Sequence, residues 1–154
     1  MTASLLVVSH SQTGGTRALT DAILAGARDE QIEGVQVAWR DALQATPDDV
    51  LACGAIVLGT PENFGYMSGA LKYFFDRIYY PCLDHTRGRP YQLVVKSRDD
   101  GVGAALSVQR IVAGLAWREI QPPLVIGGNL LDAHLEAAHE LGMTIAASLE
   151  MGII

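Results

Sequence analysis

The stretch that decides the fold reads Ser9-His10-Ser11-Gln12-Thr13-Gly14-Gly15-Thr16. It lies between an apolar run, residues 5–8, and a segment with helical spacing that starts near Thr16. The first amides of a helix have no partner within the helix, and the positive end of the helix dipole adds to their attraction for an anion. Glycine also lets a backbone approach a ligand closely. A strand, a turn rich in glycine and hydroxyl groups, and a helix therefore predict a phosphate-binding loop.

This loop differs from the common nucleotide-binding loops. No lysine follows Gly14 or Gly15, as a nucleoside-triphosphatase loop requires, and the loop lacks the dinucleotide pattern Gly-x-Gly-x-x-Gly. The nearest cation in the sequence, Arg17, lies inside the expected helix. The pattern Ser11-x-Thr13-Gly14-x-Thr16 resembles the phosphate loop of flavodoxin-like FMN proteins, in which neutral donors hold the terminal phosphate. An ordinary glycine-rich turn, with Thr16 capping a helix, is the alternative interpretation.

Length and composition narrow the class of protein. A chain of 154 residues predicts one domain, residues 1–154, with a single core. Apolar residues make up 49% and charged residues 18%, so we expect apolar surface to remain for a partner subunit or a cofactor. The net charge of −6 argues against a nucleic-acid partner. No run reaches the roughly 18 apolar residues of a membrane span, and no signal peptide is recognisable, which predicts a cytoplasmic protein without membrane insertion.

Apolar runs predict five strands, which alternate with segments of helical spacing. The strands are expected at residues 5–8, 35–38, 55–59, 91–95 and 124–126. The helices are expected near Thr16, after Gly101, and behind the N-caps Thr46, Ser68 and Asp132. This alternation predicts an α/β fold with three α/β/α layers, in which a doubly wound, five-stranded parallel sheet has the flavodoxin order 2-1-3-4-5. Such a sheet binds ligands beyond the carboxyl ends of its strands, so the loops after strands one and three should lie side by side.

The loop after the third strand carries the more specific signal. It reads Leu58-Gly59-Thr60-Pro61-Glu62-Asn63-Phe64-Gly65-Tyr66-Met67-Ser68 and continues into a helix that contains Phe74-Phe75-Asp76. It resembles the second flavin loop of the NAD(P)H-dependent FMN reductase and tryptophan-repressor-binding-type quinone reductase group. Those proteins carry Gly-Thr-Pro, then aromatic-Gly-x-Met-Ser/Ala, then a helix ending in a similar Phe-x-Asp. Together with the first loop and the topology, the resemblance covers nearly the whole chain and implies a flavodoxin-like FMN domain.

The resemblance assigns cofactor contacts to three segments. The ribityl phosphate would be cradled by Ser9, Ser11, Gln12, Thr13, Gly14, Gly15 and Thr16. Backbone amides and an aromatic face for the isoalloxazine ring would come from Pro61, Glu62, Asn63, Phe64 and Gly65. The other side would be closed by Ser97, Arg98 and Asp99, although residues 96–101 replace the glycine-rich third loop common in the group. Phe64 as a packed aromatic, and Arg98 with Asp99 as a solvated pair, are the structural alternatives.

Two functions agree with this site. The first is an NAD(P)H-dependent reductase that passes electrons from NADH or NADPH through FMN to a small acceptor, a flavin or a quinone. The alternative is a flavodoxin-like carrier that exchanges single electrons with protein partners. Four basic residues expected near the site favour the reductase, because carriers present an acidic docking face; they are Arg87, Arg89, Lys96 and Arg98. The flavin performs the redox chemistry, so no side chain is assigned a catalytic role.

The sequence also bears on assembly and on metals. Tyr73, Tyr79 and Tyr80 exceed what the inner face of their helix needs, which predicts a homodimer or homotetramer. No metal site is expected, because His134 and His139 are five residues apart and so about 140° apart around a helix. Cys53 is expected to be a small core residue.

Overall fold

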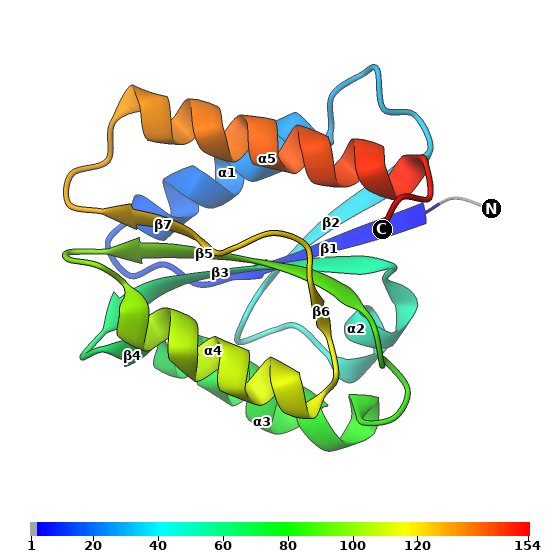
Figure 1. Cartoon of the computed structure of the whole chain (residues 1–154), viewed down its shortest axis with the longest axis horizontal. Coiled ribbons are helices and arrows are strands. Elements are labelled where there is room, and N and C mark those ends of the chain that lie inside the picture. The colour runs from blue at the N-terminus through cyan, green and yellow to red at the C-terminus, as the bar shows by residue number, and fades with distance from the viewer. Residues whose placement is uncertain (1–2) are drawn as a thin grey trace.

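The computed structural model describes residues 3–154, which form a central sheet between two layers of helices (Figure 1). The strands of this part of the chain are β1 (Ala3–Ser9), β2 (Val35–Asp41), β3 (Ala55–Asn63), β4 (Tyr66–Met67), β5 (Pro90–Ser97), β6 (Arg118–Glu119) and β7 (Leu124–Gly127). The helices are α1 (Gly15–Ala27), α2 (Pro47–Ala52), α3 (Gly69–Cys82), α4 (Val102–Gly114) and α5 (Asp132–Glu150). Strands and helices alternate along the chain as the sequence predicts, except that β4 follows β3 and β7 follows β6 with no helix between them.

The sheet has the predicted order, with one strand divided. The parallel strands β2, β1, β3 and β5 are neighbours in that order, and β6 and β7 both pair with β5. β6 pairs with the start of β5 and β7 with its end, so together they occupy the place of the fifth strand. Pro122 and Pro123 lie between them, and proline cannot donate to a strand ladder. The buried Gln92 holds this interruption by donating to the Pro122 carbonyl and accepting from the Gln121 amide.

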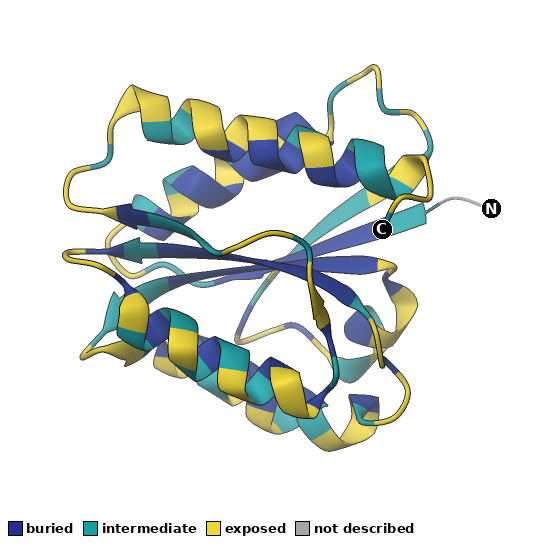
Figure 2. Ribbon diagram, viewed as in Figure 1, coloured by how far each residue is buried: buried dark blue, intermediate teal, exposed yellow. Residues whose placement is uncertain are grey.

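The two faces of the sheet have separate cores. α1 and α5 cover one face, and α2, α3 and α4 cover the other (Figure 1). Alternate residues of β3 enter the two cores: Ala55 and Val57 pack under α1 and α5, whereas Ile56 and Leu58 pack under the other helices. The central strands are accordingly buried along most of their length (Figure 2). This explains why residues 55–59 show no polar alternation.

α1 and α5 pack with their backbones in direct contact at two glycines. A Cβ atom at Gly26 would lie 1.9 Å from the carbonyl oxygen of His139, and one at Gly142 would lie 2.1 Å from that of Ile23. Only glycine is compatible with either position. The contact anchors α1, whose first turn follows the glycine-rich loop.

Two of the three predicted N-caps are confirmed. Thr46 forms a capping box with Asp49, and the Ser68 hydroxyl accepts a hydrogen bond from the Leu71 amide. Asp132 is wrong as a cap, because it is the first residue of α5 and the cap position belongs to Leu131. The Leu131 amide donates to Nδ1 of His134 at 3.0 Å. The imidazole of His134, and not the carboxylate of Asp132, therefore binds the backbone where α5 begins.

Candidate functional site

The loop after β1 leaves its backbone donors available. β1 ends at Ser9, α1 begins at Gly15, and the N-cap between them is Gly14, whose φ of 98° lies in the left-handed region that favours glycine. The Gly14 amide donates to the Ser11 hydroxyl at 3.0 Å, which closes the turn. No side chain caps the helix, and the first hydrogen bond into it runs from the Ala18 amide to the Gly14 carbonyl. The amides of residues 15–17 are therefore free to bind an anion.

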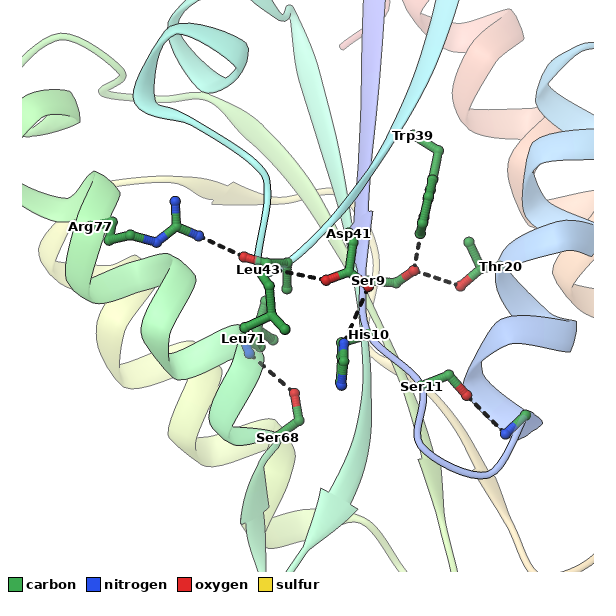
Figure 3. Close-up of polar contacts among 12 residues, drawn as sticks. Ser9, His10, Ser11, Thr20, Trp39, Asp41, Leu43, Ser68, Leu71 and Arg77 are labelled. Atoms are coloured by element: carbon green, nitrogen blue, oxygen red, sulfur yellow. Dashed lines mark hydrogen bonds and ion pairs between the residues drawn. The ribbon is translucent and has the colours of Figure 1, made fainter.

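Ser9 lies beneath this loop. It is 3% exposed, and its Oγ accepts hydrogen bonds from the Thr20 hydroxyl at 3.0 Å and from the Trp39 indole at 2.9 Å (Figure 3). These contacts tie the end of β1 to α1 and β2. Ser9 thus holds the base of the loop, whereas Ser11 and Thr13 line the main cavity.

A second polar group holds the other side of the loop. His10 Nδ1 lies 3.2 Å from a carboxylate oxygen of Asp41, whose other oxygen accepts from the Leu43 amide (Figure 3). Arg77 of α3 donates to the carbonyls of Ala42 and Ala45. The segment after β2 is therefore connected both to the loop after β1 and to α3.

The loop after β3 is a β-hairpin rather than the irregular loop that the sequence suggested. Residues 61–63 belong to β3, and Asn63 pairs with Tyr66 of β4 across the two residues Phe64 and Gly65. Both have positive φ, 53° and 69°, the type I′ pattern that suits the twist of a hairpin. Phe64 is fully exposed. A bulky residue in this conformation costs free energy, and such strain concentrates at functional sites.

The start of α4 supports the hairpin. A carboxylate oxygen of Glu62 accepts from the Ala104 amide at 3.0 Å, where the helix dipole favours a negative charge. The Met67 amide donates to the Ser107 hydroxyl at 3.1 Å. A Cβ atom at Gly103 would lie 2.0 Å from the carbonyl oxygen of Gly65, so the backbones meet directly. The hairpin therefore keeps its position through contacts within the protein.

The third predicted segment, Ser97 to Asp99, borders the site where β5 ends. Ser97 is buried at the end of β5, and its hydroxyl donates to the Asp99 carbonyl at 2.9 Å, which shapes the turn that follows. Arg98 and Asp99 are exposed. The Arg98 carbonyl accepts from the Gly128 amide at 3.1 Å, but the Arg98 guanidinium makes no hydrogen bond or ion pair with residues 3–154 and so can bind a ligand.

The three segments meet at a cavity of about 350 Å³ at the carboxyl edge of the sheet. The predicted residues that line it are Ser11, Gln12, Thr13, Thr16, Pro61, Glu62, Asn63, Ser97 and Arg98. An adjoining cavity of about 540 Å³ shares four of these and adds Phe64, Gly65 and Asp99. Ser9 and Gly14 border a smaller space on the opposite side of the loop, and Gly15 packs against Lys96.

Sequence reasoning assigned no cofactor contact to three residues of the main cavity, although it expected one of them, Lys96, near the site. Lys96 comes from β5, and Gly128 and Asn129 follow β7. The apolar pattern of residues 91–95 predicts β5, and alternation along it is the signal that could have placed Lys96 on the side of α1. Nothing in the sequence marks the segment after β7, because its position depends on the divided edge strand.

Two of the four basic residues expected near the site are elsewhere. Arg87 and Arg89 precede β5, whose carboxyl end forms the site, so they lie at the opposite end of a strand about 23 Å long. Arg89 donates to the Val50 carbonyl and to Cys53 Sγ. Arg87 and Arg89 are close in sequence to the site residues that end β5, but the strand separates them from the site in space. Lys96 and Arg98 are the cations that border the cavity.

Both cysteines belong to the core, as expected for Cys53. Cys53 and Cys82 are buried in the cluster under α2, α3 and α4. Burial raises the pKa of both thiols, although the nearby Arg89 guanidinium lowers it in part. Neither thiol lines the cavity.

Residues 3–154 show neither a metal-binding cluster nor a candidate membrane span. They contain no group of three or more His, Cys, Asp or Glu side chains arranged to hold a metal ion. None of the helices in this range combines the length and the apolar character that a bilayer crossing demands.

A doubly wound parallel sheet, with an open glycine-rich loop after β1 and a hairpin after β3 at its carboxyl edge, is the arrangement of flavodoxin-like proteins. Residues 1–130 match the family of NADPH-dependent FMN reductases. The chain belongs to this family, and FMN is its cofactor. The resemblance seen in the sequence is confirmed.

Two curated relatives match parts of the chain. A flavodoxin of Aquifex aeolicus is 34% identical over 48% of this chain and 39% of its own. An NAD(P)H dehydrogenase (quinone) of Acidithiobacillus ferrooxidans is 31% identical over 47% of this chain and 46% of its own. The chain thus spans less than half the length of these relatives.

Solved structures share the fold over nearly the whole chain. An archaeal flavodoxin has a TM-score of 0.82 at 20% identity, covering 96% of this chain and 99% of its own. A WrbA-like flavodoxin from Agrobacterium tumefaciens has a TM-score of 0.77 at 18% identity, covering 97% and 99%. A flavodiiron core from Synechocystis has a TM-score of 0.81 at 14% identity, covering 97% of this chain and 36% of that one. These likenesses confirm the flavodoxin-like α/β/α architecture.

The donors of the cavity suit FMN. Thr16 is 3% exposed, its methyl group faces Gly59, and its hydroxyl makes no hydrogen bond with residues 3–154 although the residue lines the cavity. Gln12 and Thr13 also lack partners in that range and stand beside the free amides of α1. Neutral donors around a helix N-terminus match a phosphate, and the adjoining cavity beside Phe64 offers an aromatic face.

Proposed function

We propose that this chain is an NAD(P)H-dependent reductase that uses FMN to reduce a small acceptor, a flavin or a quinone. The match of residues 1–130 to the reductase family carries the proposal. When bound, FMN accepts a hydride and passes the electrons on. Residues 1–154 would act as one flavin domain in the cytoplasm, as the sequence predicts.

The residues of the two loops would bind different parts of FMN. Ser11, Thr13 and Thr16, with the amides that begin α1, would bind the phosphate. The hairpin would place the edges of Pro61, Asn63 and Gly65 and the ring of Phe64 against the isoalloxazine. Because the hairpin rests on α4, these groups are in position before the cofactor arrives, which lowers the entropic cost of binding.

The larger cavity would hold the isoalloxazine ring and admit the second substrate to it. Its volume of about 540 Å³ falls within the usual range for small-molecule sites, and it opens beside the exposed side chains of Phe64 and Arg98. The guanidinium of Arg98 can form charge-assisted hydrogen bonds with a phosphate of the nucleotide. Asp99 borders the same cavity, so its net field is less positive than the sequence suggested.

A one-electron carrier is the second candidate, favoured by the flavodoxin relative at 34% identity. An anaerobic stopped-flow experiment separates the two. The FMN-loaded protein is mixed with NADH or NADPH, and the flavin absorbance is followed. The reductase predicts bleaching by at least one nucleotide and recovery when a quinone or free flavin is added. If dithionite bleaches the flavin and neither nucleotide does so within minutes, the carrier function replaces the reductase.

Assembly into a homodimer or homotetramer is part of the proposal. Tyr73 and Tyr80 are exposed on α3, whereas Tyr79 is half-buried and its hydroxyl lies 2.3 Å from where a Cβ at Gly114 would be. The two exposed rings are therefore the residues left for an interface. Sedimentation at micromolar concentration measures the assembly.

A further inference from the structure

Lys96 places a positive charge at the proposed phosphate pocket, for which the sequence predicts neutral donors. Along β5, Val94 packs under α1 and α5 and Val95 packs on the other face, so alternation directs Lys96 toward α1. Its aliphatic stem lies against Gly15: the position of a Cβ at Gly15 is 3.1 Å from Cγ and 3.6 Å from Cε of Lys96. The ammonium, one bond of about 1.5 Å further, is therefore beside the first turn of α1.

The hydrogen bonds of Lys96 leave one donor for a ligand. Its Nζ donates to the Ser97 carbonyl at 3.0 Å and to the Gly128 carbonyl. An ammonium has three donors, so one N–H remains, and Lys96 lines the main cavity. No ion pair among residues 3–154 includes Lys96. The acid that lines the same cavity, Glu62, is hydrogen-bonded to the Ala104 amide.

The charges around Lys96 are unbalanced without an anion. The first turn of α1 contains no acidic residue, and the N-terminus of a helix carries a partial positive charge. A half-buried ammonium beside that terminus is repelled by it. An anion between the two is attracted to both, and a phosphate with nearly two negative charges gains most.

We propose that Lys96 is a ligand of the FMN phosphate and supplies the charged contact that the loop after β1 lacks. The inference rests on the placement of FMN in the proposed function. Lys96 approaches from β5, opposite the hydroxyls of Thr13 and Thr16, and turns its third N–H to the phosphate. The protein then prefers FMN over riboflavin, which has the same ring system without the phosphate.

The test measures binding to the apoprotein by quenching of flavin fluorescence, with FMN and with riboflavin. Lys96→Met keeps the length of the stem and removes the charge, and Lys96→Arg keeps the charge. The chain's other lysine, Lys72, is half-buried on α3, where it pairs with Asp76 and lines neither cavity of the site, so Lys72→Met is the matched control. We expect Lys96→Met to weaken FMN binding about 10- to 100-fold, with riboflavin binding and the apoprotein Tm unchanged. Lys96→Arg and Lys72→Met should retain FMN, and added salt should weaken FMN binding more in wild type than in Lys96→Met.

Other results would overturn the inference. If Lys96→Met binds FMN as tightly as wild type, Lys96 does not contact the phosphate. If it loses FMN and riboflavin equally, or if the apoprotein Tm falls, Lys96 acts by joining the segments of Ser97 and Gly128. A wild-type protein that does not bind FMN contradicts the cofactor placement itself, which distinguishes that failure from failure of this inference.

Discussion

The loop after β1 and the hairpin after β3 border the same cavity but are held in different ways. The loop is supported from beneath by Ser9 and its partners Thr20 and Trp39. The polar side-chain groups of Gln12, Thr13 and Thr16 have no partners within residues 3–154. The hairpin is supported on its outer side by α4, through Glu62, Ser107 and the Gly65–Gly103 contact. One segment leaves its hydrogen-bonding capacity for a ligand, and the other uses it within the protein.

This difference predicts separate consequences for mutation. Changes in the loop should alter FMN affinity and leave the stability of the apoprotein unchanged, because the apoprotein makes few contacts there. Changes at the base of the hairpin should lower stability as well as affinity. Three substitutions test this division.

The largest effect is expected for Thr13→Asp. The new carboxylate would face the phosphate, and a unit charge at 4 Å with an effective dielectric of 20 costs about 4 kcal/mol, close to a thousandfold in affinity. Fluorescence titration with FMN measures the loss, with Thr13→Ser as the control that keeps the hydroxyl. The Tm of the apoprotein should not change. Undiminished affinity in Thr13→Asp would place the phosphate elsewhere.

Gly103→Ala should come next and should affect both properties. Its Cβ would lie 2.0 Å from the Gly65 carbonyl oxygen, so the hairpin or α4 must shift, and such overpacking costs about 1–3 kcal/mol. Urea unfolding of the apoprotein measures the loss of stability, and titration measures the accompanying loss of FMN affinity. Gly69→Ala, in the first turn of α3 with nothing within 4 Å of its Cβ, is the matched control and should not be destabilising. Equal stabilities of the two variants would show that the hairpin does not depend on α4.

The smallest effect is expected at Phe64, where stability and affinity should change in opposite directions. Asparagine tolerates positive φ, so Phe64→Asn should stabilise the apoprotein by about 0.5–1 kcal/mol. It also removes the aromatic face, which should weaken FMN binding about 3- to 10-fold. Phe64→Leu separates the two effects, because it keeps the backbone strain and loses the ring. Unchanged FMN affinity in both variants would mean that Phe64 does not contact the flavin.

The sequence predicts the layers, the strand order and the three segments of the site, because these depend on local patterns. Residues 55–59 identify the central strand, and Ser68 and Thr46 identify helix starts. Residues 9–16 identify the phosphate loop since its glycines and hydroxyls are contiguous. Patterns of this kind need no knowledge of the rest of the molecule.

What the sequence does not predict depends on contacts between distant segments. The hairpin at Phe64 and Gly65 has no Asn-Gly signal, and its conformation is supported by α4, some forty residues later. Lys96 lines the main cavity because β5 lies beside β3 and near α1. Arg89 was misplaced because a strand carries its two ends to opposite edges of the sheet. In each case, tertiary structure decided the position.

The divided edge of the sheet has a consequence for self-association. Exposed strand edges can recruit the strands of other molecules and so begin aggregation. Here one edge offers β6, with two residues, and β7, with four, separated by Pro122 and Pro123, which have no amide hydrogen to share. A continuous ladder with another chain therefore cannot extend along this side, whereas the opposite edge of the sheet is formed by the seven residues of β2.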